Sequence, residues 1–555
     1  MPWVLSAGQT LLAFALLISV LVFFHEMGHL LVGKFFGVKV LRFSIGFGPR
    51  LGGFTWGETE YRISALPLGG YVKFAGDVPG EELPPEDKGR GYLEQPPLRK
   101  AAIAFAGPAA NFALAVVLSV LLNALPHPDY QAMVGFVIPH QPAEAAGMKS
   151  GDRVVAMDGE PVRGFNHFKE LIEARPGQTV DLDVVRAGQP LRLRITPAVR
   201  EVKSPLQTVK QGRIGFVQRP RRAEVGVVSP DSPAARAGLQ TFDVVTALDG
   251  ARVESWEDLS TRLAASSAPH RLSVLRKREV PAPGATLWTA DPLELQMPAP
   301  GEGKAGALAF GLECADLNVF SVKPGSAAAE AGLLRGDRIV SIAGKPALFW
   351  PDDVDAATRA AGGNPLALTV RRGGKLLDLT VKQHLHQERD EAGVRVPVPE
   401  LGASYDGNIL DCGGHDEVVS VRFPLPEAAG RGVRLAWDST RGMALGLFKM
   451  FTGDISSEAL GGPLMIADVS RKALDAGLLP YLSIMALISI SLGLMNLIPI
   501  PVLDGFHILS AAIEAVRRRP LSLRFREVAN MVGVALVLSL MLFALKNDVV
   551  RKFFD

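Results

Sequence analysis

The sequence contains almost no cysteine: Cys314 and Cys412 are the two in a chain of 555 residues. This excludes a scaffold held by several disulfides and any cysteine-rich metal site, and leaves either one disulfide or two thiols. Neither sign of charge dominates, because 59 Lys and Arg oppose 57 Asp and Glu. A formal net charge of +2 gives no strong field to attract nucleic acid, so we expect no nucleic-acid partner.

Charged residues are also absent from four long apolar stretches. The chain is 48% hydrophobic and 21% charged, with a mean hydropathy of +0.20, a composition typical of a membrane protein with a large water-soluble part. About 20 apolar residues in a helix cross a bilayer. We therefore predict transmembrane helices within residues 1–33, 101–126, 476–504 and 528–545. The first stretch has neither the basic start nor the cleavage site of a secretory signal peptide.

The basic residues near the ends of these spans predict the orientation. They gather in two connections: Lys34, Lys39, Arg42, Arg90, Arg99 and Lys100 in residues 34–100, and Arg517, Arg518, Arg519, Arg524 and Arg526 in residues 505–527. Because basic loops stay in the cytoplasm, both connections are expected there. The two termini and the long segment between the second and third spans are then expected outside the cytoplasm.

That outer segment repeats one unit three times. Runs of small residues end at Gly147, Gly238 and Gly332, which lie 91 and 94 residues apart. An Ala-rich helical turn that ends at a Gly in the left-handed conformation, followed by an alternating strand, is the local structure that we expect. The repeat predicts three small β/α domains, at 129–200, 212–297 and 306–385. In the connector that follows, residues 386–475, the spacing at 435–451 fits an amphipathic helix on the membrane surface or a packed connection.

A metal-binding pattern stands at the inner end of the first span: His25-Glu26-Met27-Gly28-His29. Residues four apart share a helix face, so His25 and His29 can bind one zinc ion while Glu26 accepts a proton from bound water. Such side chains near lipid are costly unless they line a cavity and bind something. The alternative is a polar cluster at the membrane interface.

The candidate for a third ligand is Asp504, in the segment Asn496-Leu-Ile-Pro-Ile-Pro-Val-Leu-Asp504-Gly505. Its two prolines end the helix, because proline lacks the N–H that a helix needs. Non-helical backbone at membrane depth survives only where protein or a wet cavity satisfies it. The predicted topology places Asp504 at the same depth as the two histidines, and three ligands leave one position open for water. Zinc is inferred from the ligand type.

Together these two motifs resemble the site-2 protease family of intramembrane metalloproteases. Further matches are residues 43–48, 66–73, 107–111, 452–454 and 461–463. The resemblance implies His25, His29 and Asp504 as ligands of one catalytic Zn²⁺ and Glu26 as the general base. It also suggests that Asn496 holds the substrate backbone and that Asn111 supports the site. An interhelical hydrogen bond is the alternative for each asparagine.

The resemblance extends to the substrate. Residues 60–64 and 70–74 alternate like a hairpin, and the matching family segment is a membrane-associated β-loop whose edge, here Tyr71, Val72 and Lys73, offers strand addition. A plain cytosolic hairpin is the alternative. The three repeats resemble PDZ domains, which recognise peptide termini, although spacers or a size filter would give the same pattern. The family usually has two such copies, and Phe506 replaces a common Gly.

The expected fold is a polytopic α-helical membrane protein with four transmembrane helices and an inserted extracytoplasmic tandem of PDZ-like β/α modules. The resemblance implies a zinc endopeptidase of the bacterial inner membrane that cleaves single-span membrane proteins within or near the membrane segment. An anti-sigma factor already trimmed outside, or leftover signal peptides, would be its substrates. A catalytically inactive PDZ-bearing scaffold or chaperone and a metal transporter are the alternatives.

Overall fold

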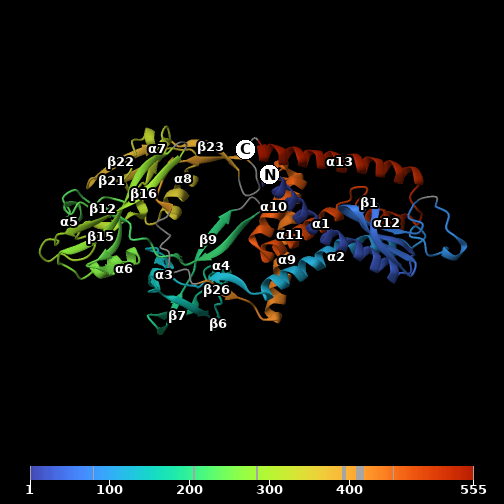
Figure 1. Ribbon diagram of the computed structural model, residues 1–555, viewed down its shortest axis with the longest axis horizontal. Helices are drawn as coiled ribbons and strands as arrows, with labels where there is room; N and C mark the ends of the chain where they lie inside the picture. Colours follow the sequence, from blue (N-terminus) through green and yellow to red (C-terminus); the bar gives the residue numbers. More distant parts are fainter. Residues whose placement is uncertain are drawn as a thin grey trace. The chain divides into compact units, whose positions relative to one another are not determined.

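The computed structural model describes residues 2–78, 81–203, 207–282, 285–389, 395–407, 418–453 and 455–553. Cys412 lies outside these ranges, so the predicted choice between a disulfide and two thiols stays a prediction. The chain forms two compact units, one made mainly of residues 1–127 and 422–555 and the other of residues 128–391 and 395–421. Figure 1 traces the elements of both units.

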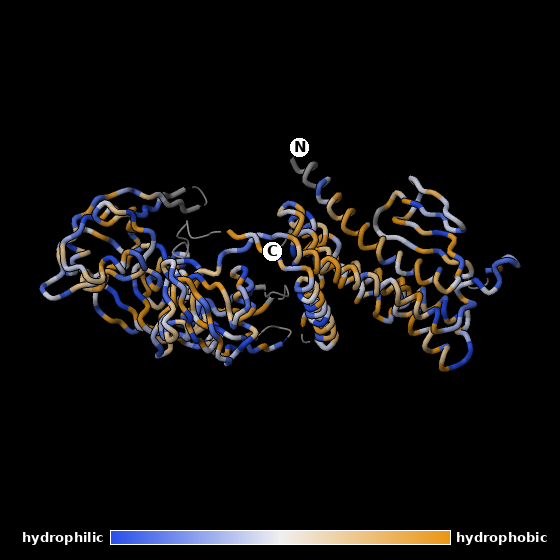
Figure 2. The backbone as a smooth tube through the Cα atoms, turned by 90° about the horizontal axis from the view of Figure 1, so that it is seen from below, coloured by the Kyte–Doolittle hydropathy of each residue, from blue (hydrophilic) through white to orange (hydrophobic). Residues whose placement is uncertain are grey.

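Four helices of the first unit are long and apolar enough to cross a membrane. They are α1 (Pro2–Phe35), α2 (Pro97–Ala124), α11 (Leu478–Leu497) and α13 (Leu523–Phe553), and they overlap all four predicted spans. Figure 2 shows apolar residues along this unit. Leu17 and Leu21 of α1 pack with Leu114 of α2 and Met485 of α11 in the core of the bundle. Helix α2 is the most buried of the four and α13 the least.

Three further helices complete the first unit: α9 (Leu425–Thr452), α10 (Pro463–Ala476) and α12 (Asp504–Arg517). Helix α9 begins ten residues before the predicted amphipathic segment, and Gly432 lets its backbone approach Val120 of α2. Large apolar side chains such as Trp437 and Phe448 stay exposed on α9, as expected for a helix at a membrane surface. Most of the predicted turn 505–527 is helical, in α12 and the start of α13 (from Leu523).

Between α1 and α2, two long bent strands, β1 (Val40–Trp56) and β2 (Thr59–Phe74), form a small sheet, followed by the short helix η1 (Pro85–Asp87). Residues 40–45 of β1 pair with both 60–63 and 70–74 of β2. The two segments expected to form a hairpin therefore do not pair with each other, because β1 lies between them. As a result, residues 70–74 form an outer edge of the sheet.

The second unit holds three modules, each with its own hydrophobic core. Short strands β3 (His127–Tyr130) and β26 (Val418–Val421) pair where the chain enters and leaves this unit. Module 1 consists of β4 (Phe136–Val137), α3 (Pro142–Ala145), β5 (Arg153–Met157), β6 (Glu160–Pro161), α4 (Phe165–Glu173), β7 (Val180–Arg186), β8 (Gln189–Ile195), β9 (Ala198–Lys203), β10 (Thr208–Arg213) and β11 (Phe216–Val217).

Modules 2 and 3 repeat this order of elements, except that module 2 has no counterpart of the strands β9 and β10 among its described residues. Module 2 consists of β12 (Val225–Val227), α5 (Pro233–Arg236), β13 (Val244–Leu248), β14 (Ala251–Arg252), α6 (Trp256–Leu263), β15 (His270–Ala282), β16 (Ala285–Met297) and β17 (Leu312–Cys314), followed by the linking turn η2 (Ala315–Leu317). Module 3 consists of β18 (Ser321–Val322), α7 (Ala327–Glu330), β19 (Arg338–Ile342), β20 (Lys345–Pro346), η3 (Trp350–Val354), α8 (Asp355–Ala361), β21 (Leu366–Arg372), β22 (Lys375–Val381), β23 (His384–Arg389), β24 (Arg395–Glu400) and β25 (Ala403–Ser404).

One hydrogen-bonded clamp recurs in all three modules. In module 1, Arg186 donates to both carboxylate oxygens of Asp152 at 2.7 Å and to the carbonyl of Gly147 at 2.7 Å. The equivalent sets are Arg276, Asp243 and Gly238 in module 2 and Arg372, Asp337 and Gly332 in module 3. The three glycines have φ of 76°, 84° and 78°, the left-handed conformation predicted from the repeat.

Each module extends beyond its predicted range because its last strand pairs with its first. The pairs are β11 with β4, β17 with β12 and β25 with β18. The last strand of each module adjoins an apolar-Gly-apolar turn whose glycine has positive φ: Gly215, Gly311 and Gly402. A Cβ at each would lie within 2.2 Å of the residue that precedes the Ala-rich turn, so glycine is required there. This second repeated motif was missed by the sequence reasoning.

Modules 2 and 3 share a buried group of charges. Lys277 Nζ lies 2.9 Å from Glu224 Oε1 and also contacts the carboxylate of Asp406. Glu224 has no exposed surface. Its burial raises its pKa to about 7, because desolvation of the carboxylate outweighs the attraction of Lys277.

Candidate metal centre

Three predicted ligands converge in the first unit. His25 Nε2 lies 3.1 Å from Asp504 Oδ2, His29 Nε2 lies 3.5 Å from Asp504 Oδ1, and the two Nε2 atoms are 3.2 Å apart. Both imidazoles are buried. Two nitrogens and a carboxylate at these separations are a donor set that suits zinc, and three protein ligands leave room for water.

Two glycines allow the helices that carry this centre to approach closely. A Cβ on Gly28, inside the histidine motif of α1, would lie 2.2 Å from the backbone oxygen of Ala106 in α2. A Cβ on Gly107 would lie 2.3 Å from Nε2 of His29. Both distances are too short for any larger residue, so the histidine rings sit against bare backbone of α2.

Asp504 reaches the histidines because the chain folds back after α11. Residues 498–503 are not helical, Val502 has a φ of 86°, and α12 begins at Asp504. A Cβ on Gly505 would lie 2.4 Å from the carbonyl oxygen of Leu497, so glycine permits this return. The chain break predicted from Pro499 and Pro501 is present.

A buried ion triad fixes α12 to its neighbours. Glu514 of α12 lies 2.5 Å from Lys100 Nζ at the start of α2 and also contacts the guanidinium of Arg526 at the start of α13. Because removing one member of such a group leaves a buried charge uncompensated, the triad holds α12, and with it Asp504, in place.

The outer nitrogens of both rings have partners that suit metal binding. His29 Nδ1 lies 2.7 Å from the backbone oxygen of Ile103. A carbonyl only accepts, so Nδ1 carries the proton and Nε2 presents its lone pair to the centre. His25 Nδ1 lies 3.1 Å from the side-chain amide of Asn111, whose backbone carbonyl accepts a 2.8 Å hydrogen bond from Ser489.

A metal ion bound at Nε2 would decide which nitrogen of His25 carries the proton. When Nε2 binds a metal, Nδ1 must carry the proton and needs an acceptor. Turning the Asn111 amide by 180° places its oxygen there, and that oxygen otherwise lies buried with no hydrogen-bond partner among the described residues. The residues around the centre therefore fit a bound zinc ion.

Glu26 lies between the centre and the edge of the small sheet. Its carboxylate lies near the backbone N–H of Val72. A Cβ on Gly70 would lie 2.6 Å from Val22 Cγ1 and 3.2 Å from Glu26 Cγ. The absence of a side chain at Gly70 thus lets strand β2 lie directly on α1 beside the predicted metal ligands.

The other predicted substrate-binding residues lie in different surroundings. Tyr71 accepts hydrogen bonds from Arg62 and Arg42 and stacks on Phe47, and Lys73 pairs with Asp77 at 3.7 Å. Asn496 is partly exposed in the last turn of α11, and its side chain makes no hydrogen bond to another residue that the structure describes. Strand β2 brings the backbone of Val72 to Glu26, whereas the side chains of Tyr71 and Lys73 bind elsewhere.

Sequence reasoning missed three contributors to this centre: Ile103, Gly107 and Ser489. Ile103, Gly107 and Asn111 follow one another at intervals of four along α2, so they share one face of that helix. That spacing was the available signal. Ser489 carried none, because its role depends on how α11 packs against α2.

A sequence profile described as Peptidase family M50 matches residues 13–540. The chain belongs to this family. The M50 peptidase is 30% identical to the regulator of sigma-E protease of Salmonella typhimurium, over 99% of this chain and 100% of the relative. It is 29% identical to a protease of Yersinia pestis, again over 99% of this chain and 100% of the relative. It is 30% identical, over 98% and 99%, to a Ralstonia nicotianae protein whose name describes a zinc metalloprotease.

Family and relatives together establish this M50 peptidase as a membrane metalloprotease. A solved PDZ-domain protein from Parabacteroides distasonis aligns with 51% of the chain and all of its own, at 11% identity and a TM-score of 0.12. A score this low carries no argument about the fold of the modules, so their PDZ character stays a prediction.

Proposed function

We propose that this protein is an intramembrane zinc endopeptidase with a single catalytic ion held by His25, His29 and Asp504. The observation that carries the proposal is the convergence of three donors within 3.5 Å of one another, with both outer imidazole nitrogens engaged by helix α2. A polar cluster that only met the interface would not require such oriented rings.

The catalytic roles follow from position. When bound, zinc lowers the pKa of a coordinated water and polarises the scissile carbonyl. Glu26 lies beside the ligands and accepts the proton of that water, then transfers it to the leaving amine. The backbone N–H of Val72 lies beside the Glu26 carboxylate, and Asn111 orients His25.

Strand β2 supplies the means to present a substrate. A membrane-spanning helix shields its carbonyls in internal hydrogen bonds, so the segment must become extended before it is cleaved. Residues 70–74 form a sheet edge next to Glu26. An extended segment that pairs with this edge, at Tyr71, Val72 and Lys73, would place its peptide bonds at the metal centre.

The substrates are single-span membrane proteins of the bacterial inner membrane, an anti-sigma factor among them. The names of relatives that regulate sigma E and the four candidate spans support this. The positive-inside argument places the small sheet in the cytoplasm and both termini and the three modules outside. The modules bind peptide termini or limit substrate size.

The test is cleavage of a reconstituted single-span substrate by purified protein together with zinc analysis. Glu26→Gln is expected to retain zinc and lose cleavage by at least a thousandfold, because the proton acceptor is gone. Glu58→Gln, an exposed glutamate in the turn between β1 and β2, is the matched control and should cleave normally. Retained cleavage by Glu26→Gln would remove the assigned base. Wild-type protein that binds zinc but cleaves no substrate would favour the inactive scaffold.

A further inference from the structure

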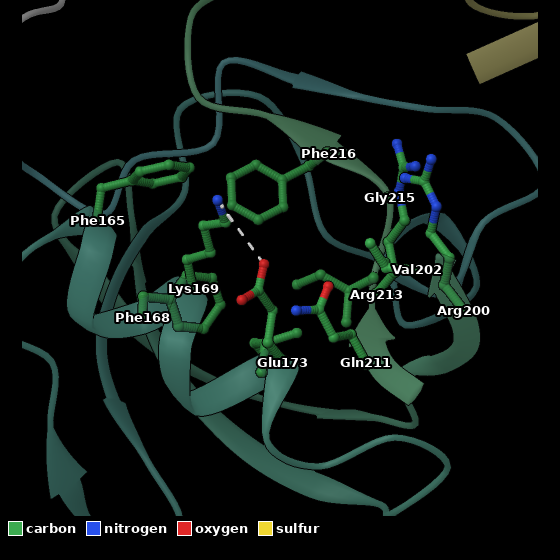
Figure 3. A pocket seen from close by; sticks show the side chains of 13 residues that line it. Phe165, Phe168, Lys169, Glu173, Arg200, Val202, Gln211, Arg213, Gly215 and Phe216 are labelled. Carbon is green, nitrogen blue, oxygen red and sulfur yellow. Dashed lines mark ion pairs between the residues drawn. The ribbon is translucent and has the colours of Figure 1, made fainter. Parts of the chain in front are cut away.

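Module 1 contains an open groove. A cavity of about 320 Å³ lies between helix α4 and residues 211–216 (Figure 3). Its floor is apolar, with Phe168, Ile172 and Ile214 buried. Phe165 and Phe216 are partly exposed at its opening. A floor of this kind suits one or two apolar side chains of an extended ligand.

One side of the groove is a strand edge. In β11, the carbonyls of Gly215 and Val217 accept hydrogen bonds from Ile138 and Gly135 on the β4 side. Polar groups of successive residues in a strand point to opposite edges. The N–H and C=O of Phe216 therefore face the groove, where an added peptide strand would pair with them.

The rim of the groove is basic. Lys169 is paired with Glu173 at 3.7 Å, whereas Arg200 has no acidic partner among the described residues. Arg213 stands directly before the turn at Gly215 and forms an ion pair with Asp352. Asp352 belongs to module 3, so a carboxylate from another module already pairs with one of the basic side chains on this rim.

Apolar packing between modules 1 and 3 holds Asp352 beside Arg213. Phe349, three residues earlier, packs against Phe136 with ring centroids 5.9 Å apart, and Ile138 and Val217 complete the same cluster. The segment of module 3 that ends at Asp352 is therefore anchored on the strand pair that forms the back of the groove. The partly exposed Arg213–Asp352 pair is the polar part of this contact.

The equivalent surfaces of the other modules differ. In module 2, Trp256 at the start of α6 and Leu312 after the glycine are nearly inaccessible, because they belong to the module core. Module 3 has a cavity of about 860 Å³ whose lining mixes Lys323 and Arg359 with three carboxylates. Only module 1, among these described surfaces, combines an open apolar floor with a predominantly basic rim.

We propose that the module 1 groove binds an extended acidic polypeptide segment at Arg213 and Arg200, and that Asp352 of module 3 is its built-in competitor. Binding of such a segment replaces the Arg213–Asp352 pair and loosens the contact between modules 1 and 3. The affinity of the groove for an acidic segment therefore depends on whether module 3 contacts module 1. This inference rests on the proposed peptide-binding role of the modules, and it does not depend on the proposed peptidase chemistry.

The experiment uses full-length Glu26→Gln protein in detergent and fluorescence anisotropy. The probe is a fluorescein-labelled octapeptide, Gly-Ser-Gly-Glu-Asp-Glu-Val-Phe, with a free carboxyl terminus, and its partner peptide has Gln, Asn and Gln in place of the three acids. Asp352→Asn is expected to tighten binding of the acidic probe about fivefold, the upper range measured for an ion pair at the surface. Arg213→Gln is expected to weaken it roughly tenfold.

The double variant separates competition from other effects. With Arg213→Gln present, Asp352→Asn should add nothing, because its target is gone. The controls are Arg192→Gln, an exposed arginine of module 1 outside the groove, and Asp378→Asn, an exposed acid of module 3. Both should leave binding unchanged.

Three results would overturn the proposal. They are unchanged affinity in Asp352→Asn, tightening that persists in the double variant, and acidic and neutral probes that bind equally. Because every measurement uses a cleavage-deficient background, such a failure leaves the peptidase assignment intact, and a failed cleavage assay leaves this proposal intact.

Discussion

Replacing Asn111 by leucine isolates the contribution of one buried hydrogen bond to zinc binding. Leucine has the same number and branching of side-chain heavy atoms as asparagine but neither donates nor accepts. Asn111 is fully buried, and its amide lies 3.1 Å from Nδ1 of His25. Without zinc, His25 can place its proton on Nε2 and donate to Asp504, 3.1 Å away. With zinc on Nε2 the proton must move to Nδ1, where Asn111→Leu offers no acceptor.

Without zinc the variant leaves only the lone pair of Nδ1 without a donor, whereas with zinc it leaves a buried N–H without an acceptor, so the larger cost falls on the zinc-bound state. A buried donor left without a partner costs about 1–3 kcal/mol, which corresponds to a loss of roughly 5-fold to 150-fold in zinc affinity. The loss commonly seen when such an outer hydrogen bond is removed is about 10–100-fold. Asn111→Asp should retain or strengthen zinc binding, because both oxygens of its carboxylate are acceptors and either one can accept from Nδ1.

Competition with a fluorescent zinc chelator measures this affinity in detergent. Ser489→Ala, which removes only the hydrogen bond to the Asn111 backbone, is the control and should change zinc affinity less than threefold. An Asn111→Leu protein that keeps its melting temperature and its wild-type zinc affinity would refute the reasoning. Asn111 would then be a helix-packing residue.

Three further predictions concern other parts of the molecule. Asp504→Asn should lower zinc affinity at least tenfold, and unchanged metal content by mass spectrometry would place the third ligand elsewhere. Gly70→Ala should reduce cleavage at least tenfold while zinc is retained, because its Cβ would meet Val22 at 2.6 Å. Gly52→Ala is the control, because its Cβ meets nothing within 4 Å. Equal activities of the two variants would contradict the role of the sheet edge. Glu224 has a folded-state pKa of about 7, above its ordinary value of 4.5, so the folded protein holds a proton there that the unfolded chain releases. Stability should therefore fall as pH rises from 4.5 to 7 and then level off; Glu224→Gln should reduce this fall, measured as a melting temperature, by roughly 3 °C, and an unaltered pH profile would exclude the assignment.

The sequence predicted the long helices well because they depend on local pattern. The spacing of His25 and His29 is also local, and their role as metal ligands stays a prediction. A stretch without charge is apolar whatever its neighbours are, and His25 and His29 share a helix face by spacing alone. The sequence predicted the strand pairing of residues 60–64 and 70–74 poorly. Alternation shows that a segment is a strand but not which strand lies beside it. Here β1 lies between the two segments and pairs with both.

The extent of the modules was underestimated for a related reason. The Ala-rich runs mark the middle of each repeat, whereas the strands that close it, such as β11 and β25, are two residues long. So short a strand has no periodicity to detect. Only its pairing with the first strand of the module, set by the packed core, defines the boundary.

By itself, the sequence determined four apolar spans, a threefold repeat and the residues able to hold a metal, since composition and spacing act within one segment. The tertiary structure decided what no single segment contains: Asp504 meeting His25 and His29, the backbone of Val72 lying beside Glu26, and Asp352 reaching Arg213. Each of these contacts joins distant parts of the chain, and their geometry depends on how closely backbones pack at a few glycines. Packing of that kind is a property of the whole fold.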